Sequence, residues 1–128
     1  MVVRVIESWV FSDASEAMSS EAVLERLRGR IVGGQLEAWL TSSSGRLLAI
    51  VTNTERAMVM LLDGEGDPGE HAVDPGADGW SIGFVLANGQ HDEYPNEDTV
   101  PLEEAFRILG RIITEGSPPS DAAWSVDR

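Results

Sequence analysis

The chain lacks several residue types, and each absence excludes a class of protein. It has no cysteine, which excludes disulfides, thiolate metal sites and cysteine nucleophiles. No apolar run approaches the roughly 18 residues of a membrane-spanning helix. The N-terminus also lacks the basic segment and apolar core of a signal peptide. These absences predict a cytoplasmic protein with no membrane partner.

Lysine is also missing, and the nine basic residues are all arginine. No arginine lies between Arg56 and Arg107, and the fifty residues of that interval carry twelve of the thirteen net negative charges. The acids are Asp63, Glu65, Asp67, Glu70, Asp74, Asp78, Asp92, Glu93, Glu97, Asp98, Glu103 and Glu104. Such a one-sided charge repels phosphates, so we expect no nucleic-acid partner. It attracts basic proteins or cations, although plain solubility explains an acidic surface equally well.

The stretch 80–95 predicts a β-hairpin. Trp80, Ile82, Phe84 and Leu86 alternate with small residues, as in a half-buried strand. The dipeptide at 88–89, Asn-Gly, is typical of a two-residue type I′ turn.

That turn sets the expected register of the hairpin. It places Gly83 opposite Tyr94, an aromatic side chain that shields bare backbone. The same register puts His91 and Glu93 on the face that carries Trp80. Either the second strand frays into solvent there, or these polar groups lie at the rim of the core.

Hydrophobic periodicity predicts the remaining elements. We expect a helix from residue 21 to 28, with Ser20 before it and Gly29 or the glycine pair at 33–34 ending it. A second helix is expected over 101–115, with Pro101 at its first position and Gly116 after it. The expected strands are 2–11, 35–41, 47–52, 57–62, 71–73 and 122–126.

These elements predict one α+β domain over residues 1–128. Its expected architecture is a single antiparallel sheet of five to seven strands, a meander plus the hairpin, with both helices packed on one face. The alternative is a half-barrel wrapped around the C-terminal helix. The oligomeric state stays open between a monomer and a weak dimer.

Catalytic motifs are not convincing in this sequence. The H-x-E formed by His91 and Glu93 lacks the cysteines of a zinc deaminase. The acids that begin at Asp63 resemble the start of a calcium loop, but the required glycine is Pro68. Neither histidine lies in a nucleophile motif. We therefore predict no enzymatic activity, no cofactor and no metal site.

The C-terminal half shows an ordered set of markers. They are Asn88-Gly89, Tyr94-Pro95, the run from Val100 to Ala105 read VPLEEA, Gly116, Pro118-Pro119 and Trp124. In this order and spacing the chain resembles the Imm1 family of immunity proteins. The resemblance implies an α+β protein that binds and blocks a cognate toxin domain, often of the deaminase class, without catalysis or cofactor.

The acidic interval fits this implied role. A deaminase that acts on nucleic acid presents a basic groove, and an acidic protein can occupy that groove and exclude the substrate. The candidate interface residues for this toxin domain are Asp63, Glu65, Asp67, Asp78, Trp80, His91, Asp92, Glu93, Tyr94, Glu97 and Asp98.

Two other functions stay open from the sequence. One is a small-molecule or peptide binding module, for which we expect an apolar cleft lined by Trp39 or Trp80. The other is a metal-dependent enzyme, for which His71 and His91 must converge with nearby carboxylates.

Overall fold

The structure is a computed structural model that describes residues 7–14 and 18–128. In chain order its elements are β1 (Trp9–Phe11), α1 (Ser20–Val32), β2 (Glu37–Ser42), β3 (Leu47–Thr52), β4 (Arg56–Leu62), β5 (Glu70–Ala72), β6 (Trp80–Val85), β7 (His91–Pro95), the 3₁₀ turn η1 (Asn96–Asp98), β8 (Val100–Pro101), α2 (Leu102–Glu115) and β9 (Trp124–Val126).

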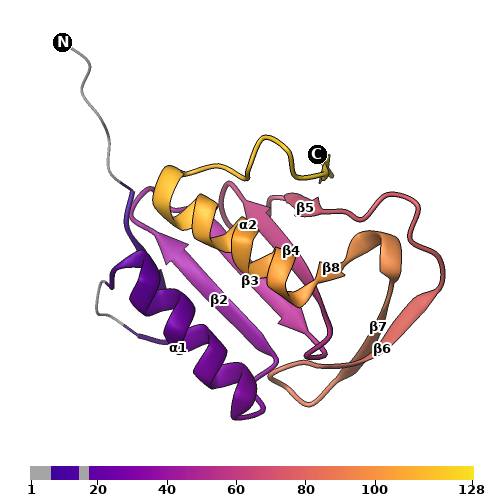
Figure 1. Ribbon diagram of the computed structural model, residues 1–128. Coiled ribbons are helices and arrows are strands. Elements are labelled where there is room, and N and C mark those ends of the chain that lie inside the picture. Colours follow the sequence, from indigo (N-terminus) through magenta and orange to yellow (C-terminus); the bar gives the residue numbers. More distant parts are fainter. Residues whose placement is uncertain (1–6, 15–17) are drawn as a thin grey trace.

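Seven strands form one antiparallel sheet, and the hairpin forms a second. The main sheet has the order β1-β2-β3-β4-β5-β9, with β8 paired to the free part of the β4 edge. Among the described residues, strands β6 and β7 pair only with each other, so the prediction of a single sheet that includes the hairpin is wrong. Both helices cover one face of the main sheet, and the hairpin lies beside the ends of β3 and β4 (Figure 1). The predicted α+β class, with two helices on one face, is confirmed.

Helix α1 packs through a narrow apolar stripe. Val23, Leu27 and Ile31, spaced four residues apart, are buried against the sheet. The N-cap is Ser19, whose hydroxyl accepts a hydrogen bond from the Ala22 N–H at 3.2 Å. Of the two predicted ends, the glycine pair at 33–34 is correct, because Gly33 is the C-cap. Gly29 stays within the helix, on its exposed side, where a helical glycine costs only about 1 kcal/mol.

Helix α2 contributes more to the core; it ends as its sequence predicts but begins one residue later, at Leu102. Six of its residues are buried, among them Phe106, Leu109 and Ile112. Pro101 precedes the first helical residue, and Gly116 ends the helix with φ 83°, donating its N–H to the Ile112 carbonyl at 2.8 Å. Arg46 also donates a hydrogen bond at 2.9 Å to the carbonyl of Gly116, which ties the helix end to the sheet.

The main sheet buries side chains on both of its faces. On the helix side, Leu40, Leu48, Ile50 and Val59 join the core beneath α1 and α2. On the opposite side, Ala49 and Val51 of β3 are also buried, although no helix covers them. Strand β3 is therefore the central strand covered on both sides that its apolar sequence predicts.

Most predicted strands appear with shifts of one or two residues. The predicted strand 2–11 is represented by β1, while residues 2–6 lie outside the described residues. Strand β9 is the expected final strand, and it forms one edge of the sheet. Neither helix of the described chain has the length and apolar character needed to cross a bilayer.

Candidate functional site

The turn of the β6–β7 hairpin differs from the predicted one. Leu86 closes on Gln90 with an N–H to carbonyl bond of 2.8 Å, and Gly89 donates its N–H to the Leu86 carbonyl. The loop thus has three residues, and only Gly89, with φ 86°, adopts a left-handed conformation. This is a type I turn followed by a glycine, the next commonest hairpin connection after the two-residue turns. The predicted type I′ turn is wrong, and the register moves by one residue.

A β-bulge at Gly83 moves the register again. Ser81 pairs with Tyr94 and Phe84 pairs with Asp92, so two residues of β6 lie opposite one residue of β7. Gly83 has φ 91°, a conformation that favours glycine. The prediction that Tyr94 lies opposite Gly83 is therefore wrong, because the bulge and the longer turn each shift the pairing.

The bulge inverts the alternation of side chains along β6. Phe84 is fully buried, whereas Trp80 and Ile82 expose 64% and 71% of their surface. The prediction that these three share one buried face is wrong for this reason. Trp80, Ile82, Val85, His91 and Glu93 now form what we call the outer face of the hairpin. Ile82 was missed as a candidate, although an isolated glycine within a strand pattern is a known bulge signal.

The inner face of the hairpin packs on the main sheet, on the side away from the helices. Phe84 meets the ring of Tyr94 edge-on, with centroids 4.8 Å apart, and β6 contacts β3. Burial, and then the hydrogen bond to Asp92, raise the pKa of Tyr94 to about 12. The hairpin therefore lies against the sheet face that carries the buried Val51 and that no helix covers in the described structure.

Two side-chain hydrogen bonds join the hairpin to the sheet. Asn53 donates from its amide to the Ile82 carbonyl at 2.9 Å, and Glu37 accepts from the Ala87 N–H at 2.9 Å. Glu37 also accepts a hydrogen bond from the indole N–H of Trp39. Trp39 is half-buried, and its indole N–H thus has a hydrogen-bond partner. Trp39 is therefore not an exposed aromatic side chain.

The two ends of the hairpin are fastened together. Asn96 donates its backbone N–H to the Gly79 carbonyl and its side-chain amide to the Asp78 carbonyl, both at 2.9 Å. Arg56 then binds the segments on either side, with hydrogen bonds to Asp74 and to Thr99. The hairpin is thus held at its base, along its inner face and at its turn.

Arginines from distant parts of the sequence neutralise much of the acidic interval. Arg128 pairs with Asp63, Asp67 and Glu70, and Arg56 pairs with Asp74. Glu103 and Glu104 pair with arginines of the two helices, and Asp98 contacts His71. Within the described residues, five of the twelve acids form no ion pair, namely Glu65, Asp78, Asp92, Glu93 and Glu97.

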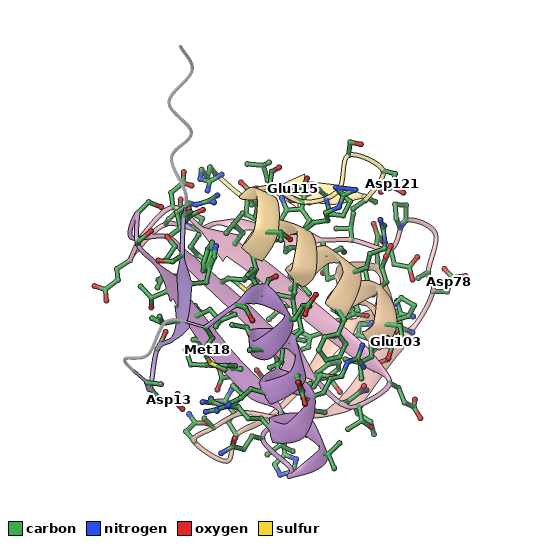
Figure 2. The ribbon with its side chains drawn as sticks, turned by 60° about the vertical axis from the view of Figure 1, so that its left-hand side comes forward. Asp13, Met18, Asp78, Glu103, Glu115 and Asp121 are labelled. Carbon is green, nitrogen blue, oxygen red and sulfur yellow. The ribbon has the colours of Figure 1, made fainter. Side chains whose placement is uncertain are left out.

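The unpaired acids gather around the hairpin. Asp92 and Glu93 belong to β7, while Asp78 and Glu97 lie two residues outside its ends. Asp78 projects from the loop before β6 (Figure 2). Only Glu65 lies elsewhere, in the loop between β4 and β5. The hairpin therefore carries most of the unpaired negative charge of this interval.

The structure divides the candidate interface residues into two groups. Asp63, Glu65 and Asp67 follow the far end of β4, which at about 3.3 Å per residue lies roughly 20 Å from Arg56, beside the hairpin. The second group lies on or next to the hairpin and comprises Asp78, Trp80, His91, Asp92, Glu93, Tyr94 and Glu97. Asp98 lies between the groups, in η1 against β5. The structure therefore brings together the second group only.

His71 in β5 lies between two carboxylates. Its Nδ1 is 2.7 Å from Asp127 and its Nε2 is 3.1 Å from Asp98. Since a neutral imidazole has only one N–H, two carboxylate acceptors favour the imidazolium form. Burial opposes the charge, but hydrogen bonds from His71 to Asp127 and Asp98 raise the pKa of His71 above 6.5. This ion triad joins β5, the end of β9 and η1.

We expect the triad to make stability depend on pH. A raised folded-state pKa adds stability that is complete below the unfolded pKa and is lost as the pH rises through the folded value. His71→Gln should therefore reduce the free energy of unfolding more in mildly acidic than in mildly alkaline buffer. Urea titrations at a series of pH values measure this. The exposed His91→Gln is the matched control, and equal losses for His71→Gln at every pH would contradict the prediction.

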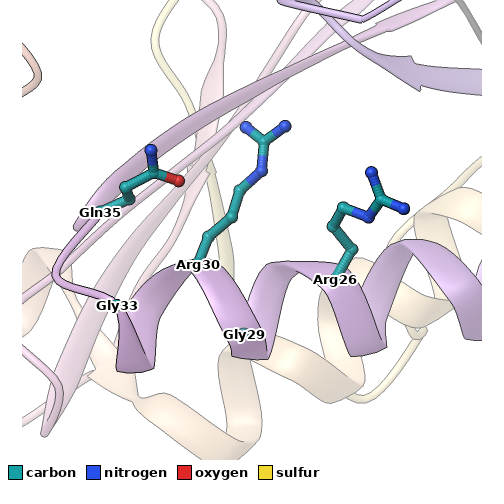
Figure 3. Close-up of a pocket in the computed structure, with 5 residues that line it drawn as sticks. All are labelled: Arg26, Gly29, Arg30, Gly33 and Gln35. Carbon is teal, nitrogen blue, oxygen red and sulfur yellow. The ribbon is translucent and has the colours of Figure 1, made fainter.

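Two surface hollows lie along α1 and at its C-terminal end. One is a shallow surface depression of about 440 Å³ lined by Arg26, Gly29, Arg30, Gly33 and Gln35 (Figure 3). The other, of about 280 Å³, lies between this helix end and the hairpin turn and is lined by Asp13, Glu37 and Leu86 among others. Neither is lined by Trp39 or Trp80, as the small-molecule alternative requires.

Metal ligands do not converge in the part of the chain that the structure describes, where no group of three or more histidine or acidic side chains is placed to hold an ion. His71 lies in the main sheet and His91 lies on the outer face of the hairpin, so the two histidines belong to different sheets. The arrangement that would favour a metal-dependent enzyme is therefore not seen among these residues.

Comparison with known proteins adds no assignment. No protein-family model matches the chain, and no curated protein matches it at a significant level. The resemblance to the Imm1 family therefore stays a prediction that depends on the C-terminal markers alone.

Proposed function

We propose that this protein is an immunity protein that binds a basic toxin domain and blocks it without catalysing a reaction. The toxin expected from the family resemblance is a nucleic-acid deaminase. The hairpin is the contact surface in this proposal. The single observation that supports it best is the gathering of Asp78, Asp92, Glu93 and Glu97 at the hairpin, while arginines neutralise most other acids of the interval.

Charge complementarity gives this surface a physical role. Unpaired carboxylates on a projecting ribbon produce a negative field with no arginine of the same ribbon to screen it. That field accelerates encounter with a positively charged groove and repels nucleic acid. A carboxylate seated where a phosphate binds then excludes the substrate from the groove.

The test is a charge-matched pair of triple variants. Asp78→Asn, Glu93→Gln and Glu97→Gln remove three charges at the hairpin. Glu21→Gln, Glu25→Gln and Glu65→Gln remove three exposed charges elsewhere and serve as the control. The partner to be tested is a basic toxin domain, to be sought at the end of a large secreted protein encoded upstream of this chain. We expect the hairpin variant to associate about tenfold more slowly at low salt, with a weaker dependence of the association rate on salt.

Two outcomes would contradict the proposal. Failure of the wild-type protein to bind the toxin domain or to protect its substrate would refute the immunity function. Equal association rates for the two triple variants would refute the role of the hairpin carboxylates.

A further inference from the structure

Two large apolar side chains stand side by side on the outer face of the hairpin. Four large apolar residues are strongly exposed in the described chain, and of these Trp80 and Ile82 are two residues apart on one strand, roughly 7 Å between their Cα atoms. The other two, Val32 and Val126, lie at the end of α1 and in β9. The outer face is therefore where exposed apolar surface is concentrated.

The backbone fixes this exposure. Without the bulge, regular alternation would put Trp80 and Ile82 on the same face as the buried Phe84. Gly83, with φ 91°, sustains the bulge, and the amide of Asn53 holds the adjoining Ile82 carbonyl. An ideal Cβ at Gly83 would lie 3.6 Å from the Asn53 side chain, which is an ordinary contact distance. The positive φ, and not a lack of space for a side chain, is therefore what requires glycine at the bulge.

The ribbon that carries the pair is held before any partner arrives. Its inner face is anchored by Phe84, its turn by Glu37 and its base by Asn96. A pre-organised surface loses little conformational freedom on binding, so its apolar contacts contribute more fully to affinity. Tryptophan is also the residue type most enriched among interface hot spots.

The charges around the pair select the partner. Glu93 lies across from Ile82 and the bulge, and Asp78 precedes Trp80 by two residues; both are exposed, and neither forms an ion pair in the described structure. The face of an indole ring and nearby carboxylates both attract arginine and lysine. A second copy of this chain is disfavoured, because a symmetric contact would place the same acids against each other.

We propose that Trp80 and Ile82 form the apolar anchor of the interface and enter a pocket of the partner that is rimmed by arginine or lysine. This inference rests on the proposed function and adds the chemistry of the partner to it. The carboxylates of the hairpin govern how fast the complex forms. The anchor governs how slowly the complex dissociates.

The experiment separates the two rates. Dissociation of the toxin domain from wild type, Trp80→Ala, Ile82→Ser and the double variant is followed at low and high salt. We expect Trp80→Ala to dissociate on the order of 30-fold faster, since a hot-spot truncation of about 2 kcal/mol or more has this effect. Its association rate should stay within about threefold of wild type. Val32→Ser and Val126→Ser are controls that remove exposed apolar surface elsewhere, and should change neither rate.

Three other outcomes would contradict the role of Trp80 and Ile82 as the apolar anchor. If wild type binds but Trp80→Ala dissociates at the same rate, the anchor is wrong and the proposed function stands. If wild type does not bind the toxin domain, both are wrong. If light scattering shows that wild type self-associates and Trp80→Ala does not, the occupant is a second copy and the anchor is again wrong. Thermal unfolding of each variant confirms that the fold is unchanged.

Discussion

A Phe84→Ala variant is expected to lose about 3–5 kcal/mol of its free energy of unfolding. Phe84 is fully buried between the hairpin and the main sheet, and its ring packs edge-on against Tyr94. Truncation leaves a cavity in a contact that no backbone hydrogen bond between the two sheets supports, because β6 and β7 pair only with each other. We expect the hairpin to separate from the sheet before the rest of the domain unfolds.

Denaturant unfolding and hydrogen exchange measure this effect. The control is Ile82→Ala, on the same strand and two residues away, which should change stability by less than about 0.5 kcal/mol because Ile82 is exposed. Amides of the hairpin should exchange faster in Phe84→Ala than in wild type, while amides of β3 stay protected. A loss below about 1 kcal/mol would show that Phe84 does not hold the hairpin.

An Arg56→Met variant is expected to lose about 3 kcal/mol of its free energy of unfolding. The guanidinium donates to the Thr99 hydroxyl at 2.7 Å, to Asp74 at 2.6 Å and to the carbonyls of Asn96 and Thr99 at 3.2 and 3.0 Å. Thr99 is fully buried, so its polar groups lose their charged donor with no water to replace it. Asp74 is partly exposed, which limits the loss from the ion pair itself.

The matched control removes another paired arginine. Arg111 pairs with Glu115 across one turn of α2, and both side chains are about half exposed. Arg111→Met should change the free energy of unfolding by less than about 0.5 kcal/mol. Arg56→Lys should restore only part of the loss, because an ammonium group cannot reproduce the planar fork. Equal effects for Arg56→Met and Arg111→Met in urea unfolding would contradict this assignment.

Periodic elements could be predicted from the sequence because their local and tertiary preferences agree. Helix α2 is an example: its apolar stripe, the proline before it and the glycine after it all indicate the same bounds. The meander of β2, β3 and β4 could be predicted from the short turns between these strands. The predicted class and the position of both helices on one face were therefore correct.

The face of the hairpin could not be predicted, because two single-residue shifts decide it. Asn-Gly indicated a two-residue turn, yet the loop includes Ala87, and Gly83 adds the bulge. Since side chains alternate with a period of two, each shift moves them to the other face.

The acidic interval shows a second limit of sequence reasoning. Distance along the chain placed Arg128 far from Asp67 and Glu70, but the pairing of β5 with β9 brings them into contact. The net charge of the interval was correct, but its unpaired charge is concentrated at the hairpin.

Because the hairpin is its own two-stranded sheet, its outward residues are released from the constraints that shape the core. Trp80, Ile82, His91 and Glu93 can change identity while Phe84 and Asn53 keep the ribbon in place. Under the proposed function, recognition and folding are thus encoded by the two opposite faces of the same sixteen-residue segment. In this proposal, single substitutions at the outward-facing residues change which toxin domain is bound, while the scaffold stays unchanged.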